Sequence, residues 1–239
     1  MKNLFSRNDI KIDMTPEYIR EHDEYVENQI RMRREWERRY AFESSGVPED
    51  MFNATFKNFT VKTDILKKIL LQVYGAYEKL AAGEYCNIIL YGNPGTGKTH
   101  LVSALLKALI YAPKKKWNDD YTEYFSGLYT KSDSITARLQ ETKNYKSRET
   151  YDQVISAYSS PDILVIDELG RDSLLSAYES NGLFSVVDKR KSKQKAVAIS
   201  SNCSWEEINN LLGAATMSRL LQSCVVVDMT GAQDYRLKK

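Results

Sequence analysis

The sequence predicts an α/β domain built on a mainly parallel, five-stranded sheet with helices on both faces. Short apolar runs have the length of buried strands, segments of helical character separate them, and a glycine-rich loop directly follows the first run. Because parallel neighbours need crossover connections of about a dozen residues, usually helices, this alternation favours one sheet covered on both sides. The expected strands span residues 87–91, 127–130, 163–167, 196–200 and 225–229.

Length and composition are those of an ordinary globular protein. The 239 residues allow one medium-sized domain with a smaller appendage, and 42% hydrophobic with 28% charged residues argue against wholesale disorder. A formal charge of +2 is too small to indicate nucleic-acid binding, so such a surface must come from local clusters. The three cysteines stand far apart, and no apolar run approaches the roughly 20 residues of a membrane helix. We therefore expect a cytoplasmic protein with no disulfide framework and no membrane partner.

Residues 1–45 are expected to form a helical amino-terminal arm. Thr15 has the chemistry of an N-cap and Pro16 suits the first helical position, so a helix should begin there and run to about Phe42. Acidic residues fill its first half and basic residues its second, which complements the helix dipole. Its apolar stripe is narrow and consists of Ile19, Val26, Ile30, Trp36 and Tyr40. The arm is either a solvated helix lying on its own domain or a partner-binding segment.

A turn-rich break at 44–48 separates this arm from the α/β domain, which is expected to span residues 46–239. Within that domain a helix at about 64–82 leads into the first strand. The chemistry that the sequence predicts lies entirely in this second part.

The glycine-rich loop joins the first expected strand to a helix-like stretch at 101–111. It fits the phosphate-binding loop pattern in the strand–loop–helix setting that this pattern requires. Its backbone N–H groups would surround phosphates, Lys98 would supply a cation to the β and γ phosphates, and the hydroxyl of Thr99 would ligate Mg²⁺. The sequence therefore predicts ATP and Mg²⁺ as cofactors. The expected cofactor-binding residues are Gly92, Asn93, Pro94, Gly95, Thr96, Gly97, Lys98, Thr99 and His100.

Polar residues follow two further strands at the edge where this loop should lie. Asp167 and Glu168 end an apolar strand, as in a Walker B motif, where Asp167 would hold Mg²⁺ through water and Glu168 would orient or deprotonate the attacking water. Asn202 follows the next strand, either as a ligand of the γ-phosphate or the water, or as a turn residue. Ser204 and Glu207 form a capping box, which we interpret as structural.

Four features occur in a characteristic order and spacing: the phosphate-binding loop, the acidic strand end, the Ser-Asn strand end and Ser-Arg-Leu at 218–220. With them the chain resembles the DnaC/DnaI-type bacterial replicative-helicase loaders and the related IstB transposition ATPases, which are AAA+ P-loop NTPases. The resemblance covers roughly residues 40–236. Its distinctive segments are SGVP at 45–48, FKNF at 56–59, DELG at 167–170, VDKR at 187–190, and the stretch from EEI to LG at 206–213.

The resemblance implies a slow, switch-like ATPase that self-associates through its ATP site. Asn202 would be the sensor 1 residue, Arg219 the arginine finger acting on a neighbouring subunit's ATP, and Arg236 a sensor 2-like residue. The family often has another arginine after the glycine that corresponds to Gly213. This chain has Ala-Ala-Thr at 214–216 instead, so part of the usual surroundings of the finger is missing.

Binding of single-stranded DNA is also implied by the resemblance. One stretch between the second strand and the Walker B strand combines basic and aromatic side chains suited to phosphates and stacked bases, although a solvated helix pair is the alternative. The basic run at 189–195 precedes a parallel strand, so we expect a solvated loop at the edge opposite the nucleotide. A basic-aromatic insertion at 114–117 has no assigned role. The candidate DNA-contacting residues are Arg138, Lys143, Tyr145, Lys146, Arg148 and Tyr151.

The leading interpretation is an ATP-dependent helicase loader that binds single-stranded DNA and delivers or activates a replicative helicase held by the arm. A transposase-helper ATPase would share every nucleotide-binding residue and differ in its partner. A nucleotide-gated DNA-binding scaffold with little turnover is the third possibility. Intact Lys98, Asp167 and Glu168 argue against the scaffold.

Overall fold

The computed structural model describes residues 15–116, 122–170 and 175–235. Its internal contacts divide the chain into two units, Met1–Arg39 and Tyr40–Lys239. The first unit holds most of helix α1, and the second holds the sheet with its surrounding helices.

Helix α1 spans Pro16–Glu43. The hydroxyl oxygen of Thr15 accepts a hydrogen bond from the N–H of Tyr18 at 3.3 Å, as the sequence predicts for an N-cap. Phe42, in the last turn, is buried in the core of the second unit, so the division between the units falls inside the helix, ahead of the break at 44–48.

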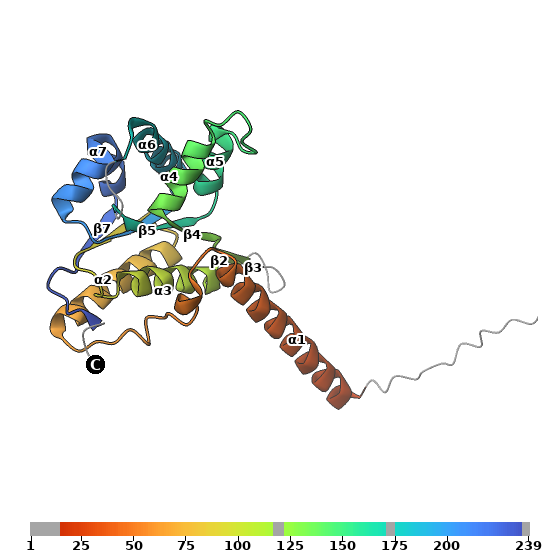
Figure 1. The fold of residues 1–239 in the computed structure, drawn as a ribbon. Helices are drawn as coiled ribbons and strands as arrows, with labels where there is room; N and C mark the ends of the chain where they lie inside the picture. Colours follow the sequence, from red (N-terminus) through yellow and green to blue (C-terminus); the bar gives the residue numbers. More distant parts are fainter. Residues whose placement is uncertain (1–14, 117–121, 171–174, 236–239) are drawn as a thin grey trace, which may run out of the picture. The chain divides into compact units, whose positions relative to one another are not determined.

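The second unit is built around a five-stranded sheet with the order β4-β5-β6-β1-β7 (Figure 1). Every neighbouring pair in this sheet is parallel. All five strands expected from the sequence are confirmed. They are β1 (Asn87–Tyr91), β4 (Gly127–Lys131), β5 (Ile163–Leu169), β6 (Ala196–Ser201) and β7 (Cys224–Asp228).

Helices cover both faces of the sheet, as expected (Figure 1). Successive strand residues point to opposite faces, so Ile88 and Leu90 of β1 lie in the core beneath α2 (Asp64–Ala81) and α3 (Lys98–Tyr111), whereas Ile89 lies in the core on the other side. The helices on that other side are α4 (Ser132–Glu141), α5 (Tyr151–Ser159), α6 (Ala177–Ser192) and α7 (Trp205–Leu221). A short 3-10 helix, η1, spans Glu49–Met51.

Helix α7 begins and bends where the sequence carries the corresponding signals. The predicted capping box is confirmed, because Ser204 Oγ accepts from Glu207 N at 3.2 Å and Glu207 Oε2 accepts from Ser204 N at 2.7 Å. Gly213, with φ 74° and ψ 158°, interrupts the helix. The bend comes directly before the Ala-Ala-Thr segment at which the chain departs from the family pattern.

The insertion without an assigned role contributes to a small antiparallel hairpin, β2 (Pro113–Lys116) with β3 (Thr122–Tyr124). Lys114 Nζ forms ion pairs with Glu123 Oε1 at 3.1 Å and with Asp162 Oδ1 at 2.9 Å. Asp162 also accepts from Ser126 N, and these donors lower its pKa against the opposing effect of burial. The hairpin is therefore tied to the start of β5.

The basic run at 189–195 lies at the edge opposite the phosphate-binding loop, as expected. Lys193 and Gln194 form an exposed turn, but the interpretation as a solvated loop is wrong for residues 189–192. Helix α6 continues to Ser192, and the side chain of Arg190 is 0% exposed. Its guanidinium donates to four backbone carbonyls, and burial lowers its pKa to about 9, so it remains charged at neutral pH. The accepting oxygens belong to Tyr158, Pro161, Asp162 and Ala196.

Candidate nucleotide-binding site

The glycine-rich loop leaves β1 and enters α3 at Lys98. A Cβ at Gly92 would lie 2.6 Å from the backbone of Met229 and of Thr230, so the close approach of the chain after β7 requires glycine there. Gly97, directly before α3, has φ 93°. The first N–H groups of α3 have no acceptor within the helix, and they lie at the end of the loop. Such a helix N-terminus favours binding of an anion.

Lys98 is the first residue of α3, and its side chain is buried against the loop. Its Nζ donates to the carbonyl oxygens of Gly92 at 2.8 Å and Asn93 at 2.6 Å, and to Thr96 Oγ1 at 3.3 Å. Thr96 Oγ1 donates to Asn93 O at 2.9 Å, and Asn93 Nδ2 donates to Thr230 O at 3.0 Å. The loop thus holds a single ammonium group beside the start of α3, where it can reach a bound phosphate.

Asp167 lies at the end of β5 with a side chain that is 1% exposed. Three hydroxyl groups donate to its carboxylate: Thr99 to Oδ2 at 3.0 Å, Tyr129 also to Oδ2, and Ser200 to Oδ1. These donors compensate for the burial of a charged group. Burial and the neighbouring carboxylate raise the pKa of Tyr129, so its hydroxyl stays protonated and donates.

Glu168 follows in an unusual backbone conformation. Its φ of 57° is left-handed, and the pairing of β5 with β6 shifts register between Ile166 and Leu169. Such a bulge redirects a side chain at the end of a strand. The Glu168 carboxylate lies 3.1 Å from Lys131 Nζ, at the end of β4, and the backbone carbonyl of Glu168 accepts from Ser132 Oγ.

A cavity of about 600 Å³ opens at the carboxyl ends of the strands. It brings most of the expected residues together, since Pro94, Gly95, Gly97, Lys98, Thr99, His100, Asp167, Glu168 and Asn202 all line it. Ser200 and Ser201 of β6 complete this wall.

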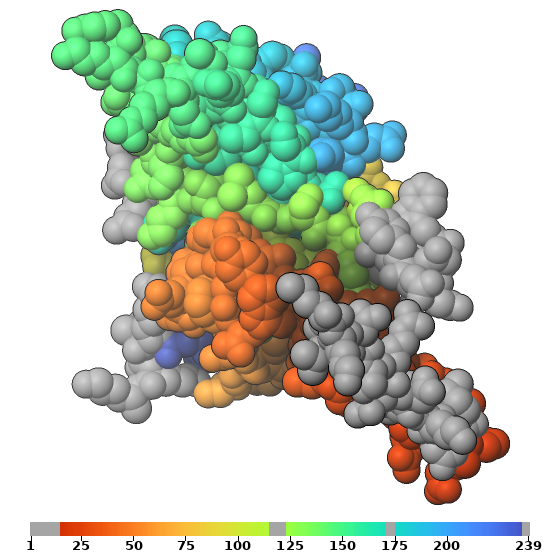
Figure 2. Space-filling model, turned by 90° about the vertical axis from the view of Figure 1, so that its right-hand side faces the viewer, coloured from red at the N-terminus to blue at the C-terminus, as the bar shows by residue number. Residues whose placement is uncertain are grey.

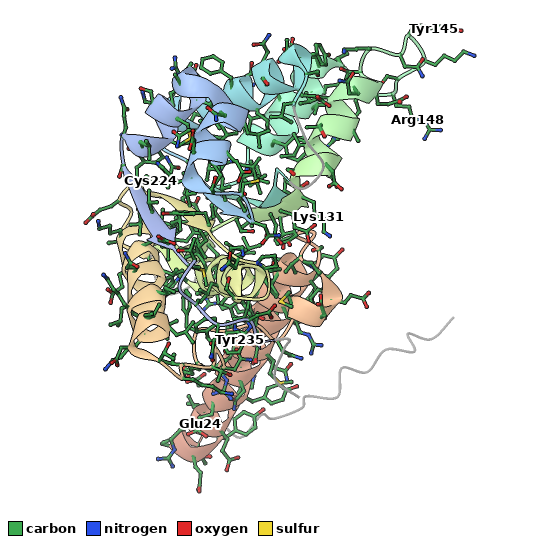
Figure 3. The ribbon with its side chains drawn as sticks, turned by 60° about the vertical axis from the view of Figure 1, so that its left-hand side comes forward. Glu24, Lys131, Tyr145, Arg148, Cys224 and Tyr235 are labelled. Atoms are coloured by element: carbon green, nitrogen blue, oxygen red, sulfur yellow. The ribbon has the colours of Figure 1, made fainter. Side chains whose placement is uncertain are left out.

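Aromatic residues from outside the phosphate-binding loop and the Walker B strand form another side of the cavity. Phe59 precedes α2, and its ring centroid lies 5.6 Å from that of His100 and 6.2 Å from that of Tyr235. His100 Nε2 is 3.0 Å from Thr55 O. Tyr235, labelled in Figure 3, donates its N–H to Gly95 O at 3.0 Å, so the segment after β7 lies against the loop. Sequence reasoning missed Phe59 and Tyr235 as cavity residues.

The residues present fit a nucleotide with Mg²⁺. The cavity combines a helix N-terminus, an ammonium group and aromatic surface, which suits phosphates together with a base. Thr99 and Asp167 offer adjacent oxygen donors, the type that Mg²⁺ prefers. Because Mg²⁺ is usually bound by one or two protein groups together with substrate phosphates and several waters, the phosphates and water would supply its remaining ligands.

Arg219 of α7 lies outside the lining of this cavity. Its Nε donates to Asp188 Oδ1 of α6, its Nη1 donates to Ala215 O at 3.2 Å, and its guanidinium lies 4.4 Å from the ring centroid of Phe184. The next carbonyl, that of Leu220, accepts from the side chain of Asn87 at the start of β1, so this end of α7 lies at the opposite edge of the sheet. Arg236, the expected sensor 2-like residue, lies outside the described residues.

Three of the candidate DNA-contacting residues, Arg138, Lys143 and Tyr151, make contacts within the chain. Arg138 is bound to Glu149, with Nε 2.6 Å from Oε2, and Lys143 Nζ lies 4.1 Å from the ring centroid of Tyr178. Tyr151 packs against that same Tyr178 ring. The turn between α4 and α5 projects from the molecule (Figure 2), and Figure 3 shows Tyr145 and Arg148 near its tip. Tyr145 is 90% exposed.

Three further polar residues at the strand ends escaped sequence reasoning: Tyr129, Lys131 and Ser200. Each belongs to a strand neighbouring β5 in the sheet. The predicted parallel topology could have indicated these residues, because it brings the carboxyl ends of all strands to one edge of the sheet. Nothing in the local sequence distinguishes them from ordinary strand residues.

The amino-acid sequence is similar to those of known helicase loaders. The chain is 29% identical over 176 residues to a replicative helicase loader DnaC of Buchnera aphidicola, covering 74% of this chain and 66% of that protein. It is 28% identical over 179 residues to the Escherichia coli K12 replicative helicase loader DnaC, covering 75% and 67%. The chain thus spans about two thirds of the length of these curated relatives.

Solved structures share the fold. The crystal structure of the DnaC helicase loader superposes with a TM-score of 0.62 at 21% identity, covering 76% of this chain and 99% of that one. AMPPCP-bound DnaA from Aquifex aeolicus gives 0.59 at 20% identity, covering 77% and 51%. Among the described residues no helix is long and apolar enough to cross a bilayer. Because the family model of the IstB-like ATP binding proteins matches residues 59–239, most of the chain, this protein belongs to that family.

Proposed function

We propose that this protein binds ATP with Mg²⁺, hydrolyses it slowly as a switch, and in that role loads a replicative helicase onto single-stranded DNA. The observation that carries the nucleotide chemistry is the contact between Thr99 and the buried Asp167, in the same cavity as Lys98 and Glu168. Similarity to loaders named DnaC supports the choice of partner.

Each cavity residue has a distinct part in this proposal. Lys98 neutralises the β and γ phosphates, Thr99 and Asp167 hold Mg²⁺, and the ion supplies charge neutralisation at the phosphates when bound. Glu168 accepts the proton of the attacking water, which requires its carboxylate to leave Lys131. Asn202, exposed at the end of β6, positions that water or the γ-phosphate.

Arg219 acts on a second copy of the chain. Its end of α7 lies at the edge opposite its own cavity, so it cannot serve the ATP of its own subunit. Asp188 and Phe184 hold the guanidinium at the surface of α6 and α7. Hydrolysis then depends on assembly.

Helix α1 provides the contact with the helicase. Exposed apolar residues recur along it at helical spacing, which is unusual for a helix that only serves as a solvated strut. They are Tyr18, Ile19, Tyr25, Val26, Ile30, Met32, Trp36 and Tyr40. An apolar partner surface would bury this stripe while the charged face stays in water.

The partner is tested by equilibrium binding of the full chain to the replicative helicase of the same organism. A double variant Tyr25→Ser, Ile30→Ser removes two exposed apolar anchors and should weaken binding by about thirtyfold or more, the usual effect of losing an interface anchor. Leu71→Ser, an equally apolar and exposed residue on α2, is the matched control and should bind normally.

Failure of the wild-type protein to bind the helicase, together with capture of a transposase from the same organism, would identify a transposition helper instead. Nucleotide binding is tested separately. Lys98→Ala should lose ATP affinity without a lower melting temperature, whereas the exposed Lys68→Ala should change neither.

A further inference from the structure

The carboxylate of Asp167 is held by donors from three elements besides its own strand. Thr99 lies on α3, Tyr129 on β4 and Ser200 on β6. Thr99 and Tyr129 donate to the same oxygen, Oδ2, and Ser200 donates to the other, Oδ1. Both oxygens are thereby fixed, and with them the plane of the carboxylate.

Tyr129 is itself rigidly placed. Its side chain is 4% exposed, and its N–H donates to Ser45 O at 2.7 Å. A Cβ at Gly46 would lie 2.5 Å from the carbonyl oxygen of Tyr129, so residues 45 and 46 pack tightly against this end of β4. A tyrosine has only two side-chain torsions, and both are fixed here by the surrounding core.

We propose that Tyr129, together with Ser200, is a positioning residue for the metal-holding carboxylate of Asp167. The inference rests on the proposed function, in which Asp167 and Thr99 hold Mg²⁺. A tyrosine that only stabilised the core could donate to any nearby acceptor. Tyr129 donates to Oδ2, the oxygen that also accepts from Thr99, the other residue proposed to hold Mg²⁺.

Outer partners that orient metal ligands typically contribute about 10- to 100-fold to metal affinity. Tyr129→Phe removes the hydroxyl and keeps the buried ring, so it should weaken metal binding by about tenfold or more while leaving metal-free nucleotide affinity unchanged. Ser200→Ala should act in the same direction through the other carboxylate oxygen.

The probe is Mn²⁺ in place of Mg²⁺, titrated by electron paramagnetic resonance against the full chain saturated with ADP. Asp167→Asn is the reference for loss of the metal ligand. Tyr85→Phe is the matched control, since Tyr85 also bonds a side chain through its hydroxyl but lies before β1, at the opposite edge of the sheet. It should bind Mn²⁺ as the wild type does.

The experiment tests two assignments separately: Asp167 as a metal ligand, and Tyr129 with Ser200 as the residues that position it. If Asp167→Asn binds Mn²⁺ as tightly as the wild type, the assignment of Asp167 as metal holder fails, and the positioning role fails with it. If Asp167→Asn weakens binding but Tyr129→Phe and Ser200→Ala do not, only the positioning role is overturned. Should Tyr129→Phe fail to fold, Ser200→Ala decides the question alone.

Discussion

Two charged side chains are almost completely buried at opposite edges of the same sheet, and their hydrogen-bond partners differ in kind. Asp167, at the carboxyl ends of the strands, accepts hydrogen bonds from three hydroxyl groups. Arg190, at the other edge, donates to four backbone carbonyls. Hydroxyl groups can rotate and exchange partners, whereas carbonyls fixed by the backbone cannot.

This difference in partners indicates a functional role for Asp167 and a structural role for Arg190. Two of the three donors to Asp167, Thr99 and Ser200, line a cavity, and their hydroxyl groups can re-form their bonds around a ligand. The carbonyls that accept from Arg190 lie at the end of α5 and near the starts of β5 and β6, so the side chain connects these elements to α6. The backbone fixes the position of each carbonyl. Substitutions at the first edge should therefore change function, and substitutions at the second should change stability.

Arg219 is the strongest challenge to this comparison, because it lies toward the structural edge yet is proposed to act in catalysis. Fingers supplied by a neighbour accelerate hydrolysis by about 10³- to 10⁵-fold, so Arg219→Ala should bind ATP and hydrolyse it slower by a factor in that range when assembled. Mixing it with inactive Lys98→Ala should restore part of the activity, measured as phosphate release. The first variant keeps its phosphate loop and the second keeps its arginine.

A protein carrying both substitutions, mixed with either single variant, is the control. If the two single variants co-assemble but stay inactive at every ratio, Arg219 is a structural residue bound to Asp188, and the comparison holds without exception.

Glu168→Gln tests the functional edge directly. The amide keeps the shape of the side chain but cannot accept the proton, so hydrolysis should fall by about 10²- to 10⁴-fold while ATP affinity and melting temperature stay near wild type. Single-turnover hydrolysis with an equilibrium binding measurement checks this. Turnover at the wild-type rate would mean that another group prepares the water.

Arg190→Met tests the structural edge. Removing the guanidinium leaves buried carbonyls without donors, and we expect the free energy of unfolding to fall by about 3–5 kcal/mol. ATP affinity of the folded fraction should not change. Lys193→Met, an exposed neighbour in the same basic run, should change stability by less than about 0.5 kcal/mol. Equal effects of the two substitutions in chemical denaturation would contradict the proposed role of Arg190.

The smallest expected effect concerns single-stranded DNA. Lys146→Ala and Arg148→Ala, in the projecting turn, should each lower the slope of log affinity against log salt by about 0.7. Arg138→Ala should do less, because Glu149 already occupies its guanidinium. Lys193→Ala at the opposite edge is the comparison variant, and a salt slope that falls only there would move the DNA surface to that edge.

The sequence predicted what depends on local pattern. Apolar runs and caps locate the strands and helix ends, and the phosphate loop with Asp167 and Glu168 marks the edge where the cavity forms. Tyr129 and Ser200 could not be found in this way, because their contacts with Asp167 depend on the register between three strands. Arg190 was misjudged for a related reason: in a basic run, only the packing of α6 shows which side chain turns inward.

The left-handed backbone at Glu168 has an evolutionary consequence. A non-glycine residue in this conformation costs on the order of 1–3 kcal/mol, a cost that glycine would largely avoid. A copy of this protein released from the need to hydrolyse ATP would gain stability by replacing Glu168 with glycine. If Glu168 prepares the water as proposed, its replacement by glycine in a relative would mark a chain that keeps the fold and has given up the reaction.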